Sequence, residues 1–145
     1  MRLRHLIKFL VLVSILVIPL ALTGCATSSV KGMDMPDFVR DAPARVKDSY
    51  QYATTNPDDL SAVPCYCGCG KMGHKSNLSC FISSGAKEAT PVYEPHASGC
   101  GICVDIAQDV KRMRAEGKTR SEVRAYIDAT YSSYGPGTDT PLPTN

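Results

Sequence analysis

Residues 100–134 read CGICVDIAQDVKRMRAEGKTRSEVRAYIDATYSSY, and this stretch decides the expected fold. Its first half carries apolar residues on one stripe at helical spacing. Gly117 suits the position just after a helix, and Thr119 opens a Thr-Arg-Ser-Glu capping box for a second helix. The stretch therefore predicts helices over residues 102–116 and 120–134, joined by a short turn as an αα-hairpin.

A shorter helix is predicted before this pair. Pro43 suits a first helical position, and Val46, Tyr50 and Ala53 then share one face. Residues 63–95 are rich in Gly, Pro and turn clusters, so we expect them to be mostly loop. The predicted fold class is all-α: a small helical domain, made of an N-terminal helix and the C-terminal αα-hairpin, with a long Cys-rich loop.

The beginning of the chain has the order of an export signal. Basic residues precede a 14-residue apolar run at residues 9–22, shorter than the roughly 20 residues of a membrane-spanning helix. The run ends in Leu-Thr-Gly-Cys25, which resembles the bacterial lipobox. The resemblance implies cleavage before Cys25, acylation of Cys25, and a lipid anchor in the bilayer on the extracytoplasmic face of the cell membrane.

Four segments are expected from these patterns. They are a lipoprotein signal peptide at 1–24, a lipidated tether at 25–35, the Cys-rich helical domain at 36–134, and a disordered tail at 135–145.

Composition argues against several classes of function. The 145-residue chain has 16 Lys+Arg and 14 Asp+Glu, and removal of the signal leaves 13 basic and 14 acidic groups. No basic face remains, so nucleic acid is not an expected partner. Ser–His–Asp arrangements, phosphate loops and paired carboxylates do not stand out, so the sequence favours a binding protein over an enzyme.

The cysteines are the residues most indicative of function in this sequence. Six of the seven lie between Cys65 and Cys103, as a C-x-C-x-C, a single cysteine and an H-x3-C-x2-C. The candidate metal ligands are Cys65, Cys67, Cys69, Cys80, His96, Cys100 and Cys103. His96 is preferred to His74 because of its spacing to Cys100.

Thiols two residues apart lie about 6.6 Å apart on an extended strand. That separation is too large for two thiolates on one ion at about 2.3 Å. The chain must therefore curl, which Gly68 and Gly70 permit.

Clustered thiols predict a soft metal ion. Cysteine ligands with Met72 nearby favour Cu(I) ahead of Zn, in a carrier or sensor that exchanges the ion with a metal-donor partner protein. Six thiols exceed the four ligands of one tetrahedral ion. Either two ions share bridging thiolates, or four cysteines bind metal and two form a disulfide.

Two alternatives stay open at this point. Six cysteines in an exported domain also fit a disulfide-stapled binding scaffold without metal. The C-x-x-C at a helix start, where free N–H groups lower a thiol pKa, also fits a thiol–disulfide oxidoreductase. Cys100 would then attack, Cys103 would resolve, and the partner would be a redox protein.

Two family resemblances accompany these patterns. Residues 64–69 read PCYCGC, and with the lipobox and the spacing His96…Cys100-x-x-Cys103 the chain resembles the bacterial PCYCGC-motif lipoproteins. That likeness implies a surface-anchored lipoprotein and no particular reaction. Residues 105–134 are similar to the helical hairpin of cytochrome c maturation thiol-oxidoreductases, which implies a redox role for the C-x-x-C. Here Gly99 replaces the Arg of that family, and the C-x-C-x-C has no counterpart there.

Overall fold

The computed structural model describes residues 35–143. The predicted signal peptide, the acylation residue Cys25 and the tether up to residue 34 lie outside the described residues. None of the helices in the described part has the length and apolar character needed to span a bilayer.

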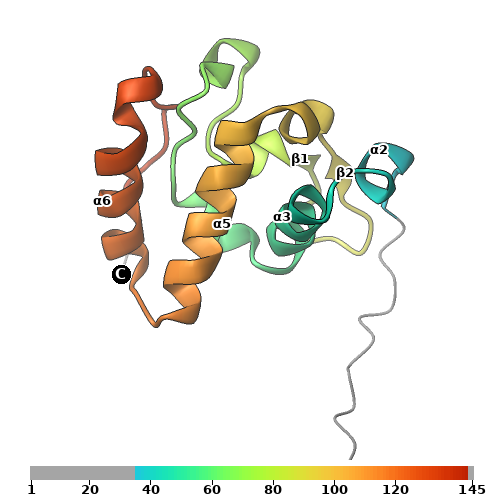
Figure 1. Ribbon diagram of the computed structural model, residues 1–145, viewed down its shortest axis with the longest axis horizontal. Coiled ribbons are helices and arrows are strands. Elements are labelled where there is room, and N and C mark those ends of the chain that lie inside the picture. The colour runs from blue at the N-terminus through green and yellow to red at the C-terminus, as the bar shows by residue number, and fades with distance from the viewer. Residues whose placement is uncertain (1–34, 144–145) are drawn as a thin grey trace, which may run out of the picture. The chain divides into compact units, whose positions relative to one another are not determined.

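Three longer helices lie in a row, with α5 between α3 and α6 (Figure 1). Their bounds are α3 Ala44–Thr55, α5 Gly101–Ala115 and α6 Arg120–Tyr131. Shorter pieces complete the helical part: α2 Asp37–Arg40, α4 Pro57–Ser61, and the 3₁₀ turns η2 Cys69–Met72, η3 Leu78–Cys80, η4 Pro95–Gly99 and η5 Ser132–Tyr134. The domain is therefore mostly helical.

The apolar stripes predicted from the sequence face the core. On α5, Cys103, Ile106 and Val110 are completely buried, and on α6 Ile127 is completely buried as well. On α3, Tyr50 is also fully buried, and its hydroxyl donates to the Glu94 carbonyl. Burial of these side chains holds the three helices together.

The connection between α5 and α6 follows from local chemistry. Gly117 has φ +81°, a left-handed conformation that ends α5 at low cost. The Thr119 side chain accepts from the Glu122 backbone N–H, and the Glu122 carboxylate accepts from the Thr119 N–H. The predicted capping box is confirmed.

The all-α prediction is wrong in one respect. Strands β1 Ile82–Ser84 and β2 Val92–Tyr93 pair as a small antiparallel sheet, with Ile82 opposite Tyr93. The pairing turns Phe81 and Ile82 into the core, where both are buried. Strands of three and two residues are too short to leave an alternating pattern in the sequence.

The chain end also differs from the prediction of a disordered tail. Thr138 and Thr140 are buried, and the segment of residues 135–141, here called the tail segment, lies against the Cys-rich loop. The Thr138 N–H donates to the Cys65 carbonyl, and the Cys65 N–H donates to the Thr138 hydroxyl, both at 3.0 Å. The Gly, Pro and Thr residues of this segment are ordered by contacts with a distant part of the chain, which a local pattern cannot reveal.

Candidate metal centre

The first cysteine cluster is anchored through the first three residues of the PCYCGC hexapeptide. Pro64 is fully buried, and the Cys65 backbone is paired with Thr138. The Tyr66 hydroxyl donates to Asp128 of α6 at 2.6 Å. The tyrosine of the motif therefore connects the loop to a helix, while the cysteines on either side turn inward.

The predicted curl of this segment is confirmed. Gly68 has φ +82° and is followed by the 3₁₀ turn η2, which begins at Cys69 and ends before Gly73 at φ +89°. Gly70 lies inside that turn without a positive φ, so only one of the two expected hinges is used. The curl brings the Cys65 and Cys67 Sγ atoms to 3.4 Å.

The second and third clusters are supplied by η3, η4 and the start of α5. Cys80 ends the turn η3, and its Sγ lies 3.5 Å from the Cys69 Sγ. His96 lies in η4, where the Glu94 side chain accepts from its backbone N–H. Cys100 is the N-cap of α5, and Cys103 follows in the first turn of that helix.

Buried hydrogen bonds position Cys103 against the loop. The Asn77 side chain is fully buried, and its amide donates to the Cys103 carbonyl at 3.2 Å. The Asn77 N–H donates to the Val63 carbonyl, next to the motif. One residue thus joins the start of the loop to the start of α5.

The three clusters meet at the middle of this arrangement. The Cys103 Sγ lies 3.4 Å from the Cys65 Sγ and 3.6 Å from the Cys67 Sγ. The His96 Nε2 lies 3.4 Å from the Cys67 Sγ. These separations are close to the roughly 3.8 Å edge of a tetrahedron with metal–sulfur bonds of about 2.3 Å.

The donor atoms form two groups of four that could hold a metal ion. The first group is Cys65, Cys67, Cys69 and Cys80, and the second is Cys67, His96, Cys100 and Cys103. Within each group, the ligand atoms all lie within 4.8 Å of one another. All seven residues selected from the sequence thus come together, and Cys67 belongs to both groups.

His74 is closer to the cluster than its sequence spacing indicated. Its Nδ1 lies 3.5 Å from the Cys80 Sγ, and its ring meets the His96 ring edge to face at 5.3 Å. Burial and the neighbouring His96 lower the pKa of His74. A neutral His74 can therefore hydrogen-bond a ligating sulfur and orient it.

All six cysteines of the described chain are free thiols. Their Sγ–Sγ contacts of 3.4–3.6 Å are far longer than the roughly 2.04 Å of a disulfide.

The metal-free thiols ionise unequally. Hydrogen bonds from Cys103 and Cys80 hold the pKa of Cys65 far below its ordinary value. Hydrogen bonding to Cys65, together with burial, raises the pKa of Cys103, and burial raises the pKa of Cys67 and Cys69. The low pKa expected at the helix start is therefore wrong for Cys103. A bound cation would displace the protons that these thiols keep.

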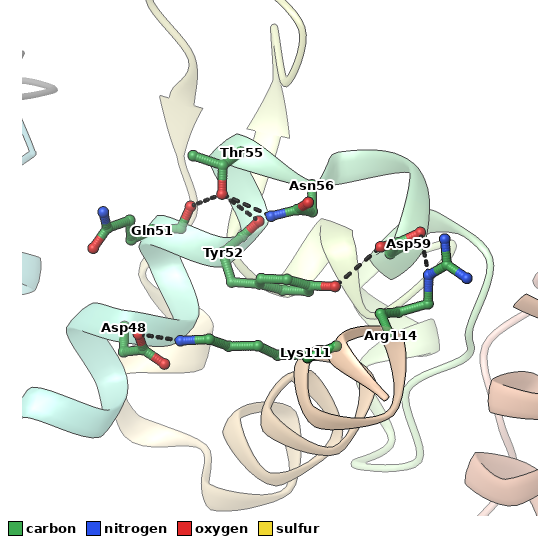
Figure 2. Close-up of a pocket in the computed structure, with 9 residues that line it drawn as sticks. Asp48, Gln51, Tyr52, Thr55, Asn56, Asp59, Lys111 and Arg114 are labelled. Carbon is green, nitrogen blue, oxygen red and sulfur yellow. Dashed lines mark hydrogen bonds and ion pairs between the residues drawn. The ribbon is translucent and has the colours of Figure 1, made fainter. Parts of the chain in front are cut away.

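A separate cavity of about 540 Å³ is lined by side chains of α3, α4 and α5 (Figure 2). Lys111 pairs there with Asp48 at 2.5 Å, and Asp59 accepts from the Tyr52 hydroxyl at 3.0 Å and pairs with Arg114 at 3.2 Å. Its lining contains no cysteine or histidine, and its charged groups neutralise one another. The cavity therefore takes no part in the metal centre.

Fold and site together define a small, mostly helical domain with a cysteine and histidine cluster of metal-binding geometry. Over residues 16–143 the chain matches the family described as "Protein of unknown function with PCYCGC motif", and it belongs to that family. No curated protein matches the chain. No solved structure matches it either.

Proposed function

We propose that the domain binds a thiophilic d¹⁰ metal ion as a carrier or sensor. The observation that supports this most strongly is the convergence of seven donor atoms, from three separate stretches of chain, into two groups of four. A packed interior gains little from free thiols placed in mutual contact, whereas a thiolate metal site requires them.

The choice of metal rests on ligand number and type. The sequence ranks Cu(I) before Zn because of Met72, but Met72 is 58% exposed to solvent. Four-donor sulfur and nitrogen groups suit zinc at least as well. Zn(II) and Cu(I) are therefore both candidates.

The location is proposed from the sequence alone. The signal-like start and the lipobox-like Leu-Thr-Gly-Cys25 support a lipid anchor on the extracytoplasmic face of the membrane. A partner protein there would donate or receive the ion. Metabolic lipid labelling of the wild type and Cys25→Ala tests the anchor, and equal labelling of the two would contradict it.

A thiol–disulfide oxidoreductase is the rival function. Its resolving thiol would be Cys103, which is fully buried and lies against Cys65 and Cys67. Cys100 is only half-buried, which suits an attacking thiol. The two functions therefore differ in whether the C-x-C-x-C cluster is needed.

The test is anaerobic purification of the full chain in detergent, followed by elemental analysis and a free-thiol count. We expect bound zinc or copper, and at least tenfold weaker affinity in both Cys67→Ser and Cys103→Ser. Cys25→Ala is the matched control and should retain the metal. An absence of metal both on purification and after reconstitution contradicts the proposal. Loss of dithiol exchange in Cys100→Ser but not in Cys67→Ser would establish the rival.

A further inference from the structure

We infer that the cluster holds two metal ions bridged by the Cys67 thiolate, an inference that rests on the proposed metal binding. Two four-coordinate ions that share one ligand require seven donor atoms. The two groups contain seven different residues, and Cys67 is the one common to both. The supply of donors therefore matches a binuclear centre with a single bridging sulfur.

The position of Cys67 suits a bridging role. Its Sγ lies 3.4 Å from the Cys65 Sγ of the first group. On the other side it lies 3.6 Å from the Cys103 Sγ and 3.4 Å from the His96 Nε2 of the second group. A thiolate has more than one lone pair, so this sulfur can bind an ion in each group at once.

Charge also favours a second ion. The seven donors comprise six thiols and one imidazole. A single divalent ion would leave the ligands of the other group buried without a cation, either protonated or as unpaired charges, and buried unpaired charge is costly. Two divalent ions neutralise four of the six thiolate charges.

The two positions differ in access to solvent. The ligands that belong to the first group alone, Cys65, Cys69 and Cys80, are at most 2% exposed. In the second group, His96 and Cys100 are half-buried, and Gly99 beside Cys100 has open space where a Cβ would stand. An incoming ligand therefore has easier access to the ion of the second group, here called the outer ion. We expect the outer ion to exchange and the inner ion, held by the first group, to be retained.

Anaerobic titration of the full-length protein with Co²⁺ tests the inference. We expect two equivalents to bind with sulfur-to-cobalt charge-transfer absorption. At two equivalents the EPR intensity should fall well below that of two isolated ions, because the shared sulfur couples their spins. Cys100→Ser, at a half-buried outer position, should keep one equivalent with an uncoupled signal. Far-UV circular dichroism checks that this variant is folded.

Different failures have different meanings. One equivalent in the wild type, or two uncoupled ions, would overturn the bridged pair while metal binding stands. No cobalt uptake would contradict the proposed function itself. Competition with a chromophoric chelator should remove the outer ion, held by the second group, at least tenfold faster than the inner ion. Equal rates would overturn the division into an exchangeable and a retained ion.

Discussion

At the scale of single residues, Tyr66 shows how a side chain inside the motif serves the fold. Its hydroxyl donates to Asp128 at 2.6 Å, and Asp128 also accepts from the Arg124 guanidinium. Burial and the hydrogen bond to Asp128 raise the pKa of Tyr66 to about 12. The phenol therefore stays protonated and can donate this bond throughout the neutral range.

Tyr66→Phe should lower the free energy of unfolding of the metal-free protein by about 1 kcal/mol, because one hydrogen bond is lost without loss of ring packing. Urea denaturation measures the change, and the metal stoichiometry should remain that of the wild type. The control is Tyr134→Phe, because Tyr134 is 63% exposed and its substitution should change the free energy of unfolding by no more than about 0.5 kcal/mol. A Tyr66→Phe protein that loses metal would show that the hydroxyl acts at the metal centre.

At the scale of elements, the tail segment lies against the Cys-rich loop and is hydrogen-bonded to it. It is joined to the loop through the Cys65–Thr138 backbone pairing and through the Thr140 hydroxyl, which donates to the Lys75 carbonyl at 2.6 Å. The Arg124 guanidinium donates to the Thr140 carbonyl at 3.1 Å and connects the tail segment to α6. A loop with so little regular structure depends on these outside partners for its order.

Thr138→Val should destabilise the domain by about 1–3 kcal/mol, because it leaves the Cys65 N–H buried without an acceptor. Thr138→Ser keeps the hydroxyl and should be much closer to the wild type. Thermal unfolding of the metal-free variants compares the two. Equal stability of Val and Ser variants would mean that the hydroxyl is not needed as an acceptor.

At the scale of the whole molecule, the helices and the loop are stabilised by different interactions. The row of α3, α5 and α6 is held by buried apolar side chains such as Ile106 and Ile127. The loop is held by hydrogen bonds and, under the proposed function, by metal–thiolate bonds. Loss of metal should therefore affect the two parts unequally.

Chelation of the metal should increase amide hydrogen exchange in residues 64–80 more than in α5 and α6. Metal that binds only the folded state adds about 2.7 kcal/mol of stability at a free concentration a hundred times its Kd. Exchange measured by mass spectrometry, with and without chelator, reports both segments in one sample. A uniform increase along the chain would show that loop and helices open as one unit.

Buried tyrosines predict an alkaline limit to stability. Burial is the main cause that raises the pKa of Tyr50, Tyr52 and Tyr131. A folded pKa above the unfolded value of about 10 favours folding fully below that pH, and the contribution is lost as the pH rises further. The urea midpoint should begin to fall near pH 10, should fall further as the pH rises to about 11, and should fall less in Tyr52→Phe. A midpoint constant over that range would contradict the assignment.

Several features were determined by the sequence itself because they depend on near neighbours. The helical stripes, the turn at Gly117 and the capping box at Thr119 need only contacts within a few residues. The seven candidate ligands could also be chosen, since the chemistry of a cysteine or histidine donor belongs to the residue. The need for the C-x-C-x-C to curl followed from strand geometry alone.

Only the tertiary structure decided how those donors are grouped. The Cys65–Cys103 contact spans 38 residues and the Cys65–Thr138 bond spans 73, and no local pattern encodes such pairings. The same holds for His74 beside Cys80 and for the short sheet. Cys67 could be selected as a ligand from its spacing, but its membership of two groups depends on three stretches of chain packing at one place. Packing between distant segments is a property of the whole fold, and therefore the cysteine common to both groups could be identified only in the folded molecule.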